Sequence, residues 1–153
     1  MLNALKEIFE RTFIDSGRVE DDTREHGIEL ATALLLVEVS RADYDEREVE
    51  GEQIAALLRD NFDLSEQEID LLVEDAKSQA DHAASLQSFT RELHARLSLA
   101  EKNKIVEMLW RVAFADRHLD KHEDHLVRKI AGLLYVSHSD LIRIRNQVRD
   151  ELL

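Results

Sequence analysis

The chain has no cysteine and no proline, and only four of its 153 residues are glycine. Without cysteine it can form no disulfide, no thiolate metal site and no cysteine nucleophile. Without proline, and with so little glycine, it lacks the residues that most often interrupt helices. Leucine, alanine, glutamate and arginine, which favour helices, are abundant instead. The composition therefore predicts an all-α protein.

Long apolar runs are also missing. The longest apolar block, residues 31–37, contains Thr32 and is followed by Glu38. It is much shorter than the roughly 20 residues that a helix needs to cross a bilayer. Residues 1–7 have an amphipathic pattern and lack the uninterrupted apolar core of a signal peptide. We expect a cytoplasmic protein that is not inserted in the membrane.

Positive charge is scarce in the first part of the chain. The formal net charge is −13, and residues 1–100 hold the whole excess, with 24 acidic residues against 10 Lys and Arg. An acidic surface repels the phosphates of nucleic acids and anionic lipids, and it attracts cations and basic protein surfaces. We expect no nucleic-acid partner. The simpler alternative is that the acids mainly keep the protein soluble.

The spacing of apolar residues predicts a compact bundle of about seven to eight helices. Their expected ranges are 3–13, 23–42, 46–62, 65–76, 86–97, 98–114, 120–134 and 137–153. Reciprocal capping patterns begin two of them, at Ser65 to Glu68 and at Ser98 to Glu101. No linker interrupts the order, so we expect one domain over 1–153. It would contain an N-terminal helix and turn (1–22) and two pseudo-symmetric halves, about 23–84 and 85–153.

Several side chains are assigned to the core or the surface by helical spacing alone. The middle of the helix at 23–42 is apolar nearly all round, which predicts a buried helix. Trp110 is expected in the core. In the helix at 120–134 the inward positions are Leu126, Val127, Ile130 and Leu133. The arginines of the last helix form a basic patch that we interpret as a solvated face, one that could dock against the acidic half: Arg143, Arg145 and Arg149.

A short segment occurs twice. Residues 37–45 and 111–118 each end an apolar run with Ala-Asp, and the two aspartates, Asp43 and Asp116, are 73 positions apart. A glutamate follows each aspartate after seven positions, at Glu50 and Glu123. An internal repeat of this kind predicts two similar structural units with two similar acidic junctions.

The junctions have a chemical and a structural interpretation. Acids at a helix end and in the next helix's first turn can direct several oxygens to one point, as calcium and magnesium require. The alternative is that they cap helices and favour the helix dipole; Asp120 and Glu123 fit a capping box. The spacing excludes an EF-hand at either junction, since position 6 of a loop that starts at Asp43 or Asp116 is Glu48 or Lys121 instead of glycine.

Enzymatic patterns are weak. No histidine has a glutamate three positions before it, which excludes the usual carboxylate di-iron bundle. There is no Gly-x-Ser-x-Gly elbow and no glycine-rich phosphate loop. His118, His122 and His125 have helical spacing and could hold zinc or nickel, although an exposed charged face is the explanation that we favour. We therefore expect a protein that is not an enzyme, with a helical metalloenzyme as the remote alternative.

The chain resembles the TerB family, which is associated with tellurite resistance and stress responses. The resemblance covers about residues 25–148 and depends on three segments: Glu38-Val39-Ser40-Arg41-Ala42-Asp43, Phe62-Asp63-Leu64-Ser65-Glu66-Gln67-Glu68 and Val112-Ala113-Phe114-Ala115-Asp116. It implies a metal-binding helical module without established catalysis, with protein partners that are often membrane-associated or chaperone-like. Where the family often has glycine after Ala-Asp, this chain has Tyr44 and Arg117.

The same resemblance implies the cation ligands, with calcium or magnesium expected before zinc. They are Asp43, Glu46 and Glu50 in the first junction, with Asp45 as a local addition, and Asp116, Asp120 and Glu123 in the second. Arg117 and Lys121 add positive charge to the second junction. We therefore expect the first to bind a cation more strongly. A purely structural or scaffold protein, whose acids only cap helices, is the alternative.

Overall fold

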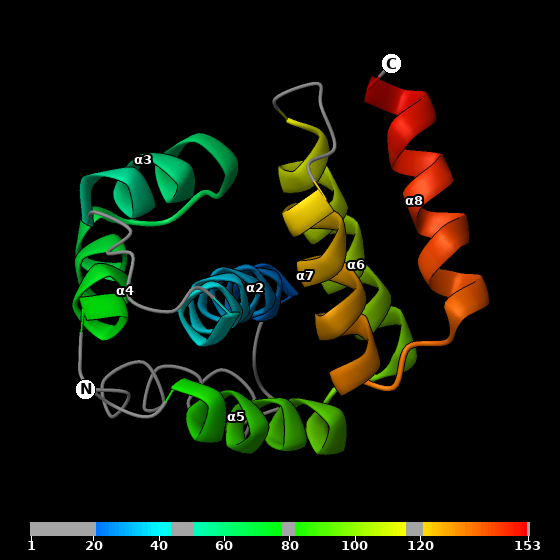
Figure 1. Cartoon of the computed structure of the whole chain (residues 1–153), viewed down its shortest axis with the longest axis horizontal. Helices are drawn as coiled ribbons and strands as arrows, with labels where there is room; N and C mark the ends of the chain where they lie inside the picture. The colour runs from blue at the N-terminus through cyan, green and yellow to red at the C-terminus, as the bar shows by residue number, and fades with distance from the viewer. Residues whose placement is uncertain (1–20, 44–50, 78–81, 116–120, 153) are drawn as a thin grey trace. The chain divides into compact units, whose positions relative to one another are not determined.

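The computed structural model describes residues 21–43, 51–77, 82–115 and 121–152 of the chain. Within these ranges it describes the backbone alone at 21–24, 39–43, 51–54, 76–77, 82–85 and 121–123. The described residues form seven α-helices and no strand (Figure 1). The prediction of an all-α protein with about seven to eight helices is confirmed. The helix predicted at 3–13 lies outside the described residues.

The chain divides into two compact units, residues 1–82 and 83–153. The first contains α2 (Asp21–Asp43), α3 (Gly51–Asn61) and α4 (Glu66–Lys77). The second contains α5 (His82–Arg96) from its second residue onward, α6 (Leu99–Phe114), α7 (Lys121–Leu133) and α8 (His138–Leu152). The charge follows this division. The first unit has 23 acidic and 8 basic residues, a charge of −15, whereas the second has 10 and 12, a charge of +2.

In the first unit, α4 packs against both α2 and α3. Every side chain of α2 from residue 30 to residue 38 is buried, which confirms the prediction of a buried central segment. The hydroxyl of Thr32 within it donates a hydrogen bond to the Ile28 carbonyl at 2.8 Å, so this polar group is satisfied inside its own helix. Neither α2 nor any other helix among the described residues is long and apolar enough to cross a membrane.

In the second unit, α6 packs against α7 and α8. The inward face of α8 consists of residues at helical spacing, Leu141, Ile144 and Val148. Trp110 of α6 is fully buried, and its indole N–H donates to the Leu141 carbonyl at 3.2 Å. The expected place of Trp110 in the core is confirmed. This hydrogen bond joins the middle of α6 to the first turn of α8.

Both predicted capping boxes are present. The Ser98 hydroxyl accepts the Glu101 N–H at 3.2 Å, and the Glu101 carboxylate accepts the Ser98 N–H at 3.0 Å. At α4 the corresponding distances between Ser65 and Glu68 are 3.1 and 2.9 Å. Each box satisfies two backbone donors that the start of a helix would otherwise leave without partners.

The expected inward stripe of α7 is wrong at its last position. Leu133 is only half-buried, whereas Leu134, one residue beyond the helix, is fully buried. Leu134 continues the buried stripe of Val127, Ile130 and Ala131 at helical spacing, and its N–H still donates to the Ile130 carbonyl at 3.0 Å. The next residue, Tyr135, adopts a left-handed conformation with φ of 59°. The Val136 N–H donates back to the Ala131 carbonyl at 2.9 Å, which closes a Schellman-type turn. This turn follows Leu134 and ends the helix.

Candidate functional site

The first acidic junction begins where α2 ends. Asp43 is the last residue of α2, and the next described residue is Gly51, which begins α3. The end of α2 therefore lies one residue beyond the end that the sequence predicted, at residue 42. The side chain of Asp43 lies outside the described part of the structure, as do Asp45, Glu46 and Glu50. Their convergence on one cation stays a prediction.

The second junction follows α6 in the same way. Phe114 is the last residue of α6, and the N–H of Ala115, its C-cap, donates to the Val112 carbonyl at 3.2 Å. The helix α7 begins at Lys121, which puts Glu123 in its first turn. Asp116 and Asp120 lie outside the described residues, and Glu123 is described by its backbone alone. Both junctions thus connect a long helix to the helix that follows it.

No other metal site emerges from the side chains that the structure describes. Among them, no group of three or more His, Asp or Glu residues is arranged to hold a metal ion. His125 is exposed on α7, while His118 and the side chain of His122 lie outside the described set. The histidine hypothesis therefore stays a prediction, as the carboxylate hypothesis does.

The helix that leads into the first junction is held by α4. The carboxylate of Glu68 contacts the His26 ring nitrogen Nε2 with both oxygens, at 3.0 and 2.9 Å. The same carboxylate accepts the Ser65 N–H, so it caps α4 and joins α4 to α2. Burial alone would raise the pKa of Glu68, but the hydrogen bonds from Ser65 and His26 outweigh it and lower that pKa. The carboxylate of Glu68 therefore favours its charged form and holds α4 against α2.

Two further contacts fix the turn between α3 and α4. Glu29 of α2 accepts the Asp63 N–H at 2.6 Å. Arg59 of α3 and Glu66 of α4 form a two-pronged ion pair with both distances at 2.8 Å. The hydrogen bond and the charge of Glu66 raise the pKa of Arg59, and those of Arg59 lower the pKa of Glu66. These side chains are exposed, so the pair contributes more to geometry than to stability.

The helix that leads into the second junction is anchored near its end. Arg111 donates to Glu107 one turn earlier at 2.9 Å and to Glu151, near the end of α8, at 2.6 Å. The hydrogen bonds with Glu151 and Glu107 raise the pKa of Arg111. Phe114, the last residue of α6, is buried and stacks on Trp110 with ring centroids 5.9 Å apart. The end of α6 is thus held by packing and by charge.

Sequence reasoning missed several polar groups in the interior. Glu38 and Asp75 of the first unit are each 1% exposed, and Lys102 of the second is 7% exposed. Lys102 is hydrogen-bonded to His94, whose ring lies 4.4 Å from that of Tyr135. The sequence contained one indication that Glu38 is buried, since Glu38 directly follows the longest apolar block in the same helix. Lys102 lies three and four positions before Ile105 and Val106, and Asp75 lies three positions after Leu72, so helical spacing also placed both on apolar faces.

The fold and its junctions define a class of small acidic, all-α modules in which a long helix leads twice into a carboxylate-rich connection. The chain belongs to the TerB family: the model described as "Tellurite resistance protein TerB" matches residues 29–146. The match includes both acidic junctions and confirms the resemblance inferred from the sequence. No curated protein and no solved structure matches the chain.

Proposed function

We propose that this TerB-family chain is a cytoplasmic, non-enzymatic, stress-associated module that binds divalent cations at its two acidic junctions and contacts protein partners through them. The observation that carries the proposal is the position of the junctions. One begins at Asp43, the last residue of α2, and the other follows Ala115, the C-cap of α6. Each therefore follows a helix C-terminus, whose last carbonyls have no partner within the helix and could add ligands to the carboxylates.

The chemistry of the ligands favours calcium or magnesium. The first junction offers Asp43, Asp45, Glu46 and Glu50, and the second offers Asp116, Asp120 and Glu123. Carboxylate and carbonyl oxygens suit these hard cations, while zinc prefers nitrogen and sulfur ligands. The negative end of the helix dipole adds a further attraction for a cation.

The two junctions differ in affinity under this proposal. The first lies in the unit with a charge of −15 and has five acids between residues 43 and 50. The second lies in the unit with a charge of +2, and Arg117 and Lys121 lie among its acids. Since a cation is attracted by the summed charge of its surroundings, the first junction binds more tightly.

A purely structural role is the competing proposal. It is favoured by Glu68 and Glu101, which cap α4 and α6 through the same Ser-x-x-Glu pattern found twice in the described residues. The junction acids would then cap α3 and α7. The two proposals differ in whether added metal stabilises the protein, because a capping carboxylate needs no metal.

Differential scanning calorimetry of chelator-stripped protein distinguishes cation binding from a purely structural role. Calcium, magnesium, manganese and zinc are added separately at millimolar concentration. We expect calcium or magnesium to raise the melting temperature, since a ligand at 100 times its Kd stabilises the folded state by about 2.7 kcal/mol. The His122→Ala variant should respond like the wild type. An unchanged melting temperature with all four metals would leave the structural role as the better account.

A further inference from the structure

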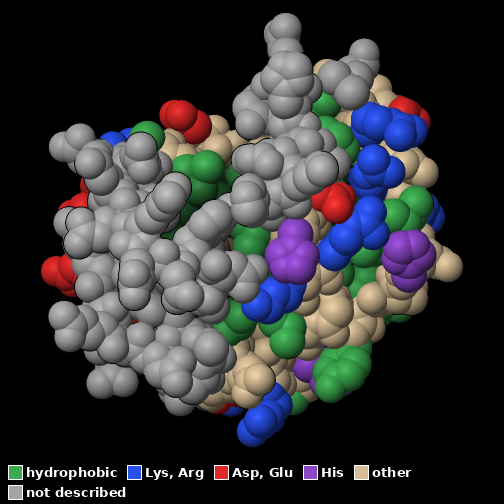
Figure 2. Space-filling view, in the orientation of Figure 1, with side chains coloured by type: hydrophobic (Ala, Val, Ile, Leu, Met, Phe, Trp, Pro, Cys, Tyr) green, Lys and Arg blue, Asp and Glu red, His purple; other side chains and the backbone are tan. Residues whose placement is uncertain are grey.

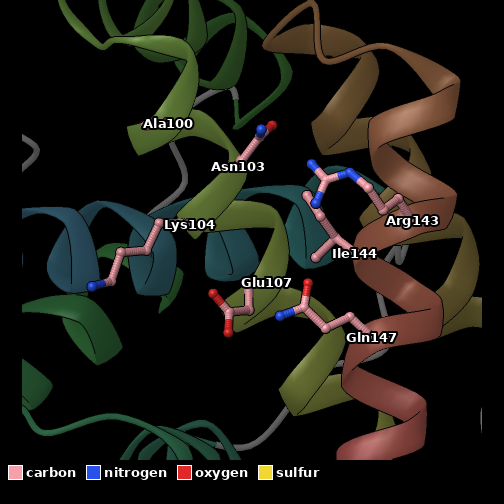
Figure 3. A pocket seen from close by; sticks show the side chains of 7 residues that line it. All are labelled: Ala100, Asn103, Lys104, Glu107, Arg143, Ile144 and Gln147. Atoms are coloured by element: carbon pink, nitrogen blue, oxygen red, sulfur yellow. The ribbon is translucent and has the colours of Figure 1, made fainter.

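A groove of about 340 Å³ lies between α6 and α8, in the second unit and at neither acidic junction. Its walls come from one face of each helix: Ala100, Asn103, Lys104 and Glu107 from α6, and Arg143, Ile144 and Gln147 from α8 (Figure 3). Ile144 is 4% exposed and belongs to the core, while Ala100 is small enough to leave space above it. This volume is at the lower end of the range found for ligand sites.

The groove contains a polar atom without a partner. The side-chain oxygen Oδ1 of Asn103 is buried and accepts no hydrogen bond. A buried acceptor left in this state destabilises the folded protein, so native structures rarely retain one without a reason. A ligand that brought an N–H donor into the groove would satisfy it.

The groove also carries positive charge. In Figure 3 the Arg143 guanidinium points from α8 toward Asn103, and the Gln147 amide points across the groove toward Glu107. Arg143 is 58% exposed and donates to Asp140 over a long 3.3 Å contact, which leaves most of its donors directed elsewhere. Glu107 is already paired with Arg111 at 2.9 Å. Figure 2 shows Lys and Arg side chains close together over α7 and α8.

We propose that this groove binds an extended acidic segment of a partner protein. A backbone N–H of the segment donates to Asn103 Oδ1, the Asn103 amide nitrogen donates to a backbone carbonyl, and an Asp or Glu side chain pairs with Arg143. A simple anion would pair with Arg143, yet it has no donor for Asn103. The combination of an unsatisfied acceptor and a guanidinium therefore selects a peptide with a carboxylate.

The test uses a positional-scanning library of end-capped hexapeptides and the full-length protein, with a chelator present so that metal at the acidic junctions plays no part. Selected peptides should be enriched in Asp or Glu at one position. Their affinity should fall about tenfold in Arg143→Gln and in Asn103→Leu, the change expected when one charge-assisted contact is lost. It should stay unchanged in Arg149→Gln, an arginine of the same helix outside the groove.

Further measurements test whether Asn103→Leu disturbs the fold and whether the peptide binds in the groove. Asn103→Leu should not lower the melting temperature, because it removes an unsatisfied buried acceptor. The side-chain amide signals of Asn103 and Gln147 should shift in NMR spectra when a selected peptide is added. Selection without acidic enrichment, or equal binding by Arg143→Gln, would overturn the proposal. So would succinate that competes as well as the selected peptides, since the groove would then take anions only.

Discussion

Glu68 contacts His26 with both carboxylate oxygens, at 3.0 and 2.9 Å, across 42 positions of the sequence. It thereby holds α4 against the helix that ends at the first acidic junction. Because Glu68 also accepts the Ser65 N–H, one side chain fixes both the start of α4 and its position on α2. The contact holds the long helix of the first unit against α4 in a chain that has no cysteine for a disulfide.

This contact predicts a pH dependence of stability. The pKa of Glu68 is lowered in the folded protein, so its contribution is complete above the unfolded value, about 4.5, and is lost as the pH falls through the lower folded value. Glu68→Gln should therefore reduce the free energy of unfolding by about 1 kcal/mol at pH 7 and by progressively less toward pH 3. Urea unfolding at several pH values measures this. Glu74→Gln, exposed on the same helix, is the control, and a deficit independent of pH would contradict the explanation.

The capping box at the start of α6 should contribute measurably to stability. Ser98→Ala removes the acceptor of the Glu101 N–H, and caps of this kind contribute about 1 kcal/mol. The free energy of unfolding should fall by that amount in urea titrations. Ser88→Ala, at an exposed position inside α5, should change it by less than about 0.5 kcal/mol. Equal effects of the two substitutions would show that the box has no special role.

The core of α2 should be sensitive to truncation. Leu35 is fully buried, so Leu35→Ala should destabilise the protein by about 3 kcal/mol through lost burial and a residual cavity. Leu99 is 57% exposed and offers a matched control, since Leu99→Ala removes the same atoms from a surface position. Thermal and urea unfolding would compare the two. A loss below about 1 kcal/mol for Leu35→Ala would contradict the burial of α2.

Trp110 should join α6 and α8 through its indole. The Trp110→Phe substitution removes the N–H bond to the Leu141 carbonyl and leaves a small void, so we expect a loss of about 2 kcal/mol. Because Trp110 is the sole tryptophan of the chain, its fluorescence in the wild type should be that of a fully buried indole and should shift to the red when the second unit unfolds. Fluorescence of an exposed indole in native buffer would contradict this assignment.

The local parts of this fold could be predicted from the sequence. The absence of proline, the spacing of apolar residues and the Ser-x-x-Glu patterns act over a few positions, and they predicted the helices and both capping boxes. Leu134 was missed because Leu133 and Leu134 follow Ile130 by three and four positions, so helical spacing fits both and does not choose between them.

Contacts between distant residues could not be predicted in this way. The pairs His26–Glu68 and Arg111–Glu151 join residues 42 and 40 positions apart, and their partners become apparent only when helices pack. The groove could not be predicted for the same reason, since Asn103 and Arg143 become neighbours only through the packing of α6 on α8. For the acidic junctions the sequence named the carboxylates and the ends of the helices before them. The geometry of their oxygens depends on the backbone between the helices, which no periodic pattern encodes.

The most direct test of cation binding is calorimetric titration of the chelator-stripped protein with calcium and with magnesium. The wild type should bind one of them with measurable heat, and the double variant Asp43→Asn with Asp116→Asn should lose that heat. A control double variant, Asp60→Asn with Asp150→Asn, removes the same charge from exposed positions on α3 and α8 and should bind like the wild type. No heat in the wild type, or equal heats in all three proteins, would contradict binding at the acidic junctions.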